Sequence, residues 1–314
     1  MRRIRLGRAL GCSLACVVLA VLLATWGFDR YWLQRPVGSG PAGPPVPREP
    51  FRQAWTTRPV ELVGLGDSVT AGFGASDKAH SYFGRLLRNP PDDAADVRGL
   101  CLSAVLPNLH ARNLAVHGTT SIEHLTGQIP RLPLFPRRVM GLVVMSTGGN
   151  DIIHNYGQTP PREGAMYGAT LRQAEPWIRA FEGRLDHLVT ALEARFPGGC
   201  RIFLADIYDP TDGVGTAFTV GLPRWPDSTR ILSAYNAALR RCAARHASVH
   251  LVPVHDAFLG HGIYCRQFWR AIYRRDDPHY WYAPNFEDPN DRGYDALRRL
   301  FLREMARVLA PQTR

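Results

Sequence analysis

A serine lies where the first predicted strand gives way to a helix, in residues 66–72 (GDSVTAG). This position puts the Ser68 hydroxyl at the carboxyl edge of a sheet, from which it can act as a nucleophile. Gly66 permits a tight turn, and the Ser68 amide at the start of the helix can donate a hydrogen bond to a developing oxyanion. Serine is also a common helix cap, so this segment alone does not identify an active site.

Two further predicted strands end in groups that donate hydrogen bonds. Residues 113–121 (NLAVHGTTS) offer the backbone amide of Gly118, and residues 148–151 (GGND) offer the side-chain amide of Asn150. Each has an ordinary explanation as a turn or loop residue. Strand ends are where ligands bind in parallel sheets, so the three segments together predict a nucleophile, Ser68, with Gly118 and Asn150 as further oxyanion donors.

These three segments resemble the SGNH, or GDSL, hydrolase family, and the resemblance covers nearly all of residues 60–309. It implies that Ser68 is the nucleophile and that Ser68, Gly118 and Asn150 form the oxyanion hole. It also implies a flavodoxin-like three-layer α/β/α sandwich that needs neither a metal nor an organic cofactor. We therefore expect a serine esterase that hydrolyses an acetylated carbohydrate, a lipid or a small ester through an acyl-serine intermediate.

The family also has an Asp-x-x-His near the C-terminus, which supplies the general base and the carboxylate that orients it. The sequence departs from this pattern. Pro289, Asn290 and Gly293 match the residues that follow the family's histidine, but Asp288 stands in the place of that histidine and Asn285 in the place of the aspartate.

The spacing that the family requires recurs upstream, at Asp276 and His279. A longer loop would carry this pair back to Ser68, so we predict Asp276, His279 and Ser68 as the catalytic residues. Two alternatives stay open at this point. Asp288 is the other candidate for the orienting carboxylate, and His154 is the other candidate for the base.

An uncharged stretch from Ala9 to Phe28 follows four arginines, Arg2, Arg3, Arg5 and Arg8. At about 1.5 Å per residue, a helix of this length spans the roughly 30 Å hydrocarbon core of a bilayer. The arginines favour the cytoplasmic side, so we expect a membrane anchor with the remaining chain in the periplasm or outside the cell. Cleavage as a signal peptide, followed by secretion, is the alternative, although the bulky Trp26 makes a poor cleavage site.

The chain divides by composition into three parts: an anchor (residues 1–30), a linker rich in proline and glycine (31–54) and a hydrolase domain (55–314). In the third part, short apolar runs alternate with amphipathic ones, which predicts an α/β fold with a parallel sheet. The five expected strands are 60–65, 113–116, 139–145, 201–207 and 249–254. The expected helices are 81–88, 121–129, 177–195, 228–245 and 291–309.

The net charge of +11 is carried almost wholly by arginine. No basic run interleaved with aromatic residues accompanies it, so we expect no nucleic-acid partner.

Cysteine and histidine recur between residues 242 and 265 without a recognised zinc spacing, so we expect no metal. Four cysteines lie in the exported part, and the sequence does not choose between disulfides and free thiols. These are Cys101, Cys200, Cys242 and Cys265.

Two other functions fit the same residues. An acyltransferase would discharge the acyl-serine onto a sugar or lipid hydroxyl, and its first half-reaction is identical to that of an esterase. A non-catalytic SGNH-like binding module would explain why the usual histidine is missing. The acyl group, the alcohol and the oligomeric state do not follow from the motifs.

Overall fold

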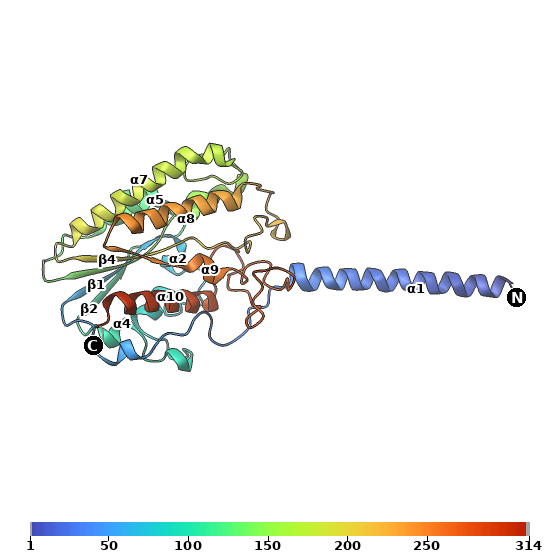
Figure 1. Ribbon diagram of the computed structural model, residues 1–314, viewed down its shortest axis with the longest axis horizontal. Helices are drawn as coiled ribbons and strands as arrows, with labels where there is room; N and C mark the ends of the chain where they lie inside the picture. The colour runs from blue at the N-terminus through green and yellow to red at the C-terminus, as the bar shows by residue number, and fades with distance from the viewer. Residues whose placement is uncertain (1, 312–314) are drawn as a thin grey trace.

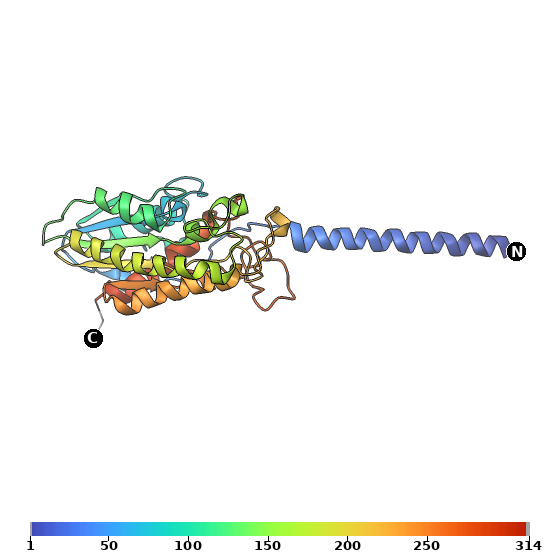
Figure 2. The same ribbon diagram turned by 90° about the horizontal axis from the view of Figure 1, so that it is seen from above.

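The computed structural model describes residues 2–311, with side chains from residue 14 onward. Helix α1 (Arg2–Phe28) projects from one end of an α/β domain (Figures 1 and 2). Within the described residues one stretch, Leu14–Leu33, is long and apolar enough to cross a membrane. The side chains of the four N-terminal arginines lie outside the described part.

Five parallel strands form one sheet in the order β2-β1-β3-β4-β5. They are β1 (Val60–Gly66), β2 (Leu109–Asn113), β3 (Met140–Ser146), β4 (Cys200–Ala205) and β5 (Val249–Val252). This order is that of flavodoxin, and it reverses direction at β1 and β3. The predicted fold class is therefore confirmed, and the ligand-binding crevice is expected at the carboxyl ends of β1 and β3.

Helices cover both faces of the sheet and bury a core on each (Figure 1). One face carries α5 (Ser121–Glu123), α7 (Leu171–Arg195) and α8 (Ser228–Arg245). The other carries α3 (Tyr82–Leu87), α4 (Leu102–Val105), α9 (Val254–Phe258) and α10 (Asp291–Leu309). Two short helices, α2 (Ser68–Ala71) and α6 (Gly149–Ile153), begin at the carboxyl ends of β1 and β3. Single turns occupy 29–33, 49–52, 95–97, 124–128, 129–131, 154–157 and 218–220.

The second strand corrects the sequence prediction, which placed it at residues 113–116. The strand is Leu109–Asn113, paired with β1 from Val60 to Gly64. It lies at the edge of the sheet and its side chains are largely exposed, so it lacks the apolar run by which buried strands are recognised. The apolar residues after Asn113 instead form the loop that leads to Gly118.

The linker predicted for residues 31–54 is extended, as its prolines require, but it packs along α10. Ala42 and Val46 are buried in the core on that face of the sheet. The Ala42 amide donates to Asp295 Oδ2 at 3.1 Å, and Arg292 Nη1 donates to the Gly40 carbonyl at 2.9 Å. The segment is therefore a strap fixed to the domain.

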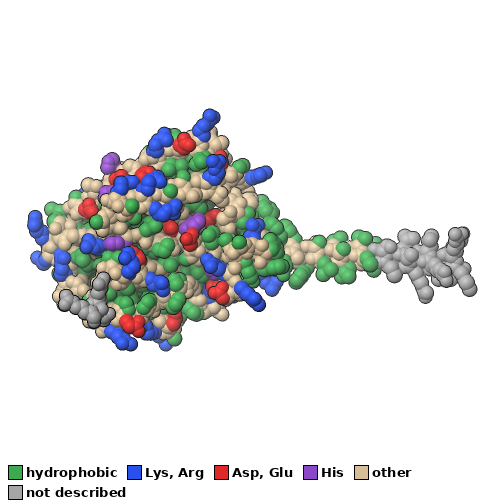
Figure 3. Space-filling view, viewed as in Figure 1, with side chains coloured by type: hydrophobic (Ala, Val, Ile, Leu, Met, Phe, Trp, Pro, Cys, Tyr) green, Lys and Arg blue, Asp and Glu red, His purple; other side chains and the backbone are tan. Residues whose placement is uncertain are grey.

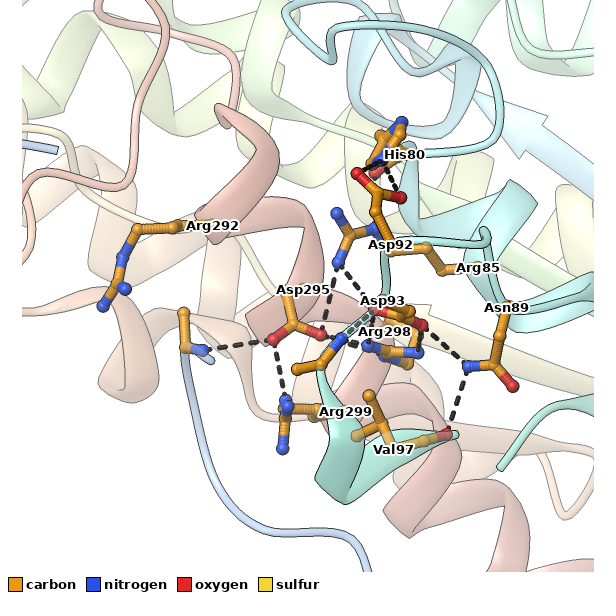
Figure 4. Close-up of polar contacts among 12 residues, drawn as sticks. His80, Arg85, Asn89, Asp92, Asp93, Val97, Arg292, Asp295, Arg298 and Arg299 are labelled. Atoms are coloured by element: carbon orange, nitrogen blue, oxygen red, sulfur yellow. Dashed lines mark hydrogen bonds and ion pairs between the residues drawn. The ribbon is translucent and has the colours of Figure 1, made fainter. Parts of the chain in front are cut away.

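A buried network of ion pairs joins the strap, α3 and α10 (Figure 4). Arg298 is fully buried and donates to Asp93 at 2.9 Å and to Asp295. Arg299 donates to Asp295 Oδ2 at 2.9 Å, and the Arg85 guanidinium lies 3.5 Å from Asp295. The network fixes the start of α10, and with it the loop that precedes this helix and ends at Asn290.

Replacing Asp295 with alanine is expected to lower the free energy of unfolding by about 3–5 kcal/mol, because it leaves buried guanidinium groups without a counter-charge. Urea unfolding of the full chain in detergent measures this. Glu304→Ala is the matched control on the same helix. Glu304 pairs with the exposed Arg307, and its loss should cost only about 0–1 kcal/mol. Equal losses for the two variants would show that the network does not stabilise the fold.

Candidate active site

Ser68 lies on the turn between β1 and α2, as the sequence predicts. Asp67 caps α2: its Oδ1 accepts hydrogen bonds from the Val69 amide at 3.1 Å and from Ser146 Oγ at 2.6 Å. Gly66 has a φ of 126°, and a Cβ there would lie 2.0 Å from the Ser146 carbonyl oxygen. Only glycine fits at this close approach of β1 and β3, and it lets the turn place Ser68 at the wall of a cavity.

Asn150, in the first turn of α6, lines the same cavity as Ser68. Its Nδ2 donates one hydrogen bond to the Thr119 carbonyl at 2.9 Å, which leaves the second amide hydrogen available. Thr119 also donates through Oγ1 to the Gly66 carbonyl at 3.2 Å. Gly118, which precedes Thr119, adopts a φ of 77° in this loop and is not among the residues that line the cavity.

Asp288 lines the cavity together with Ser68 and is only 1% exposed. Asn285 Nδ2 donates to Asp288 Oδ2 at 2.6 Å. Burial raises the pKa of Asp288 above its usual value of 3.8, whereas hydrogen bonding by Ser68 and Asn285 lowers it. Asp288 Oδ1 has no hydrogen bond of full geometry within the described chain.

His279 and Asp276 are not brought to Ser68. His279 Nδ1 bonds to Asp277 Oδ1 at 2.6 Å, and neither His279 nor Asp276 lines the cavity that holds Ser68 and Asp288. The reason is that the backbone beyond His279 is fixed to the strap, because the Tyr280 amide donates to the Pro36 carbonyl at 2.8 Å. The loop therefore cannot extend toward Ser68 as the sequence prediction required.

His154 also fails to line this cavity; it lies at the end of α6. Of the candidates that the sequence left open, the structure brings only Asp288 to Ser68. It lies in the slot that the family's histidine would fill, with Asn285 in that of the orienting aspartate. The two positions in the sequence are the same, but the residue types differ.

A family model, the GDSL-like lipase/acylhydrolase family, matches residues 65–296. This chain belongs to that family. GDSL hydrolases of this kind act on ester bonds, which agrees with the serine and the amide donor at one cavity. None of the curated proteins searched is similar to this sequence.

Solved structures to which this chain is similar include lipases and an esterase. The extracellular lipase of Streptomyces rimosus is 18% identical over 78% of this chain and 99% of the lipase, with a TM-score of 0.52. An acetylxylan esterase from Geobacillus stearothermophilus is 21% identical over 78% of this chain and 93% of its own, with a TM-score of 0.47. Phospholipase A1 from Streptomyces albidoflavus is 17% identical over 79% of this chain and 100% of its own, with a TM-score of 0.46. The first likeness supports the fold, and none of the three identifies a substrate.

His117 is a residue near this GDSL site to which the sequence gave no role. It is exposed, and its ring stacks on Phe73 with the centroids 4.3 Å apart. Its positive charge, when protonated, lowers the pKa of Asp288. The only signal in the sequence was its place directly before Gly118.

Among the carboxyl groups that line the cavity, those of Asp67 and Glu287 are each repelled by the charge of Asp288. Burial raises the pKa of Asp67 to about 6, and Asp288 adds to this by charge repulsion. Burial and Asp288 together raise the pKa of Glu287 to about 7. Burial is the larger cause in both cases, and like-charge repulsion adds to it, so these carboxyl groups ionise at higher pH than exposed ones.

The cavity has a volume of about 340 Å³ and extends from Ser68 between apolar walls. A volume of this order accommodates a small organic ligand. Its large apolar side chains come from the segments that follow β3, β4 and β5 and from α8, and include Ile153, Tyr156, Ile207, Tyr208, Val220, Leu222, Trp225, Leu232 and Ile263. The walls therefore suit an uncharged acyl chain better than a polar one.

The cysteines and histidines that the sequence flagged do not join this site. Cys242, His246 and Asp186 lie together, but Asp186 is already paired with Arg245 at 2.9 Å and with His246 at 2.9 Å. Burial raises the pKa of Cys242 to about 11, which disfavours the thiolate that a metal would need. The four cysteines of the domain are all buried free thiols.

Proposed function

We propose that this protein is a membrane-anchored serine esterase whose catalytic domain lies outside the cytoplasm and whose nucleophile is Ser68. One observation carries the assignment. Ser68, the Asn150 amide and the Asp288 carboxylate line a single cavity, so a nucleophile, an oxyanion donor and a proton acceptor meet at one place.

In this mechanism Asp288 takes the role that histidine has in the family. Its carboxylate accepts the proton of the Ser68 hydroxyl as Oγ attacks the ester carbonyl, and Asn285 holds the other carboxylate oxygen in place. The raised pKa of Asp288 makes it a stronger base than an exposed aspartate. The backbone amide of Ser68 and the side-chain amide of Asn150, which line the same cavity, stabilise the oxyanion.

The reaction is then completed in two steps. First, the bond between the acyl carbon and the alcohol oxygen breaks, and Asp288 gives its proton to the departing alcohol. The acyl group stays bonded to Ser68 Oγ. Water next attacks the acyl-serine while Asp288 accepts its proton, and the acid departs as Ser68 regains a hydrogen. An acceptor hydroxyl in place of this water would give the acyltransferase reaction.

Asn150→Ala is expected to lower kcat by roughly 10²–10³, the range for losing one oxyanion donor, with a smaller change in KM. Steady-state kinetics on an aryl ester measures both constants. An unchanged kcat would place Asn150 outside the catalytic machinery.

The proposal is tested on the full chain in detergent. A fluorophosphonate probe should label the wild-type protein on Ser68, as located by peptide mass, and aryl esters of increasing acyl length should be hydrolysed. Product analysis with an added alcohol distinguishes hydrolysis from acyl transfer. A protein that takes no label and hydrolyses no ester would be a binding module.

A further inference from the structure

Aromatic side chains from three segments gather where α1 meets the domain, and we call this group the collar. Tyr31 and Trp32 follow α1 directly, Phe218 lies in the turn after β4, and Phe268 and Trp269 lie in the loop after α9. Tyr31 packs 5.5 Å from both Phe268 and Trp269, and Trp32 packs 5.6 Å from Phe218, between ring centroids. The space-filling view shows apolar side chains concentrated at this end of the domain (Figure 3).

The collar is exposed in spite of its apolar character. Phe218 is 51% exposed, Phe268 59% and Trp269 51%. Single exposed apolar residues are common on soluble proteins, but a contiguous aromatic patch marks an interaction surface. Tyrosine and tryptophan at the end of an apolar helix are typical of the interface between a membrane and water.

Arginines accompany the aromatic side chains of the collar. Arg270 lies over the Tyr264 ring at 5.1 Å, and Arg266 donates to Gln34 Oε1 at 2.8 Å. Burial and the charge of Arg30 lower the pKa of Arg266. None of these three arginines forms an ion pair with an acidic residue of the described chain. Unpaired cations beside an aromatic surface suit the anionic phosphates of a bilayer.

The collar is continuous with the walls of the cavity at Ser68. Phe218 belongs to a single turn, Phe218–Val220, in which Val220 lines the cavity while Phe218 is exposed and packs against Trp32 with the rings tilted by 44°. A docked collar would therefore place this cavity wall directly at the docking surface.

Arg35 of the strap joins the collar to the opposite wall. Its Nη2 donates to Thr219 Oγ1 at 3.3 Å, and its guanidinium lies over the Phe286 ring at 5.1 Å. Phe286 lines the cavity, has a φ of 67° and lies two residues before Asp288. The segment that leaves α1 thus contacts both the turn at Val220 and the loop that carries Asp288.

We propose that the collar is a membrane-docking surface, which seats the domain on the bilayer spanned by α1 so that the cavity takes the acyl chains of lipid esters from that bilayer. The apolar stretch Leu14–Leu33 includes Tyr31 and Trp32 near its C-terminal end, so no spacer separates the membrane from the collar. The docking itself depends on the anchor remaining attached. The choice of lipid esters as substrate rests on the proposed function.

Docking is tested without reference to activity. Phe268→Cys is made in a full chain whose Cys12 and Cys16 are replaced by serine, because Cys16 is an exposed free thiol that would also take a label. The thiol at position 268 carries an NBD label, and the protein is reconstituted into phosphatidylcholine vesicles with and without phosphatidylglycerol. Lipids brominated on the acyl chain should quench the label at position 268. Leu134→Cys is the control: Leu134 is 68% exposed and precedes β3, so it lies near the amino ends of the strands, whereas the loops of the collar follow their carboxyl ends. Its label should not be quenched. Equal quenching at the two positions would indicate that the domain has no fixed orientation on the bilayer. A signal that depends only on protein concentration would indicate self-association. Either result would overturn the proposal.

The consequence for substrate access is tested by a ratio of rates. Turnover of a long-chain ester embedded in the vesicles is divided by turnover of a water-soluble acetyl ester, and the ratio should fall at least about tenfold in Phe268→Glu/Trp269→Glu. Leu134→Glu should leave the ratio at the wild-type value. An unchanged ratio in the double variant would overturn access through the collar. A wild-type protein inactive on both esters would instead refute the proposed function. The quenching experiment would still test docking, because it does not depend on activity.

Discussion

Replacing Ser68 with alanine is expected to abolish ester hydrolysis, with a loss in kcat on the order of 10⁴ or more. The hydroxyl is the attacking group in the proposed mechanism, and without it only binding and oxyanion stabilisation remain. The fold should be unaffected, because Asp67 rather than Ser68 caps α2. Hydrolysis of an aryl ester and labelling by fluorophosphonate measure the loss, and urea unfolding measures the stability.

Ser76→Ala is the matched control, since Ser76 is an exposed serine on the same connection between β1 and α3. It should keep both turnover and labelling. Substantial residual turnover in Ser68→Ala, in a preparation free of other esterases, would show that another group attacks the ester. Labelling of wild-type protein at a residue other than Ser68 would lead to the same conclusion.

The placement of Ser68 and Asn150 at one cavity could be predicted because the signals in the sequence are local. A glycine followed by serine at a strand end fixes a turn, and Asn150 follows a pair of glycines at the next strand of the crevice. The order of such segments along the chain is enough to place them at one edge of a parallel sheet. The structure accordingly brings Ser68 and Asn150 to one cavity.

The structure does not bring the predicted base to the cavity of Ser68, because the motif was sought by residue type. His279 has the spacing of the family's histidine, yet its loop is fixed to the strap through Tyr280. Asp288 has the position of that histidine, which the sequence did show, but an aspartate there did not match the expected chemistry. Position relative to Pro289, Asn290 and α10 was thus a better guide than the identity of the side chain.

The strap and the ion network escaped prediction for a different reason. Arg298 and Asp93 pair in the core although 205 positions separate them in the chain, and no local pattern marks either as buried. An arginine or an aspartate is predicted to lie at the surface unless the residue with which it forms an ion pair is known. Likewise, the prolines of residues 31–54 predict an extended chain without showing that Ala42 and Val46 pack against the domain.

Asp288→Asn is expected to lose nearly as much activity as Ser68→Ala, because an amide cannot accept the serine proton and the two groups act as one unit. His279→Ala should stay near the wild-type rate, since its ring bonds to Asp277 away from the cavity. The reverse result, collapse in His279→Ala with turnover retained in Asp288→Asn, would restore the assignment to Asp276 and His279.

The pH dependence identifies the base more directly than the loss of activity does. The wild-type rate should fall as the pH drops through the pKa of Asp288, which burial holds above the usual 3.8, because a protonated carboxyl cannot accept a proton. His117→Ala removes a charge that lowers this pKa, so the acid limb should move to higher pH. No movement would show that His117 does not act on the base.

Asn285→Asp combined with Asp288→His would restore the family's Asp-x-x-His at its usual position. The imidazole would then take the serine proton and the new carboxylate would orient it. We expect this double variant to recover activity relative to Asp288→Asn, with its acid limb near the ordinary histidine pKa of about 6.5. Rate–pH profiles on one soluble ester compare it with the wild type. If the double variant is folded and labelled by fluorophosphonate but its acid limb coincides with that of the wild type, then position 288 does not supply the base, and the proton acceptor must come from another part of the cavity.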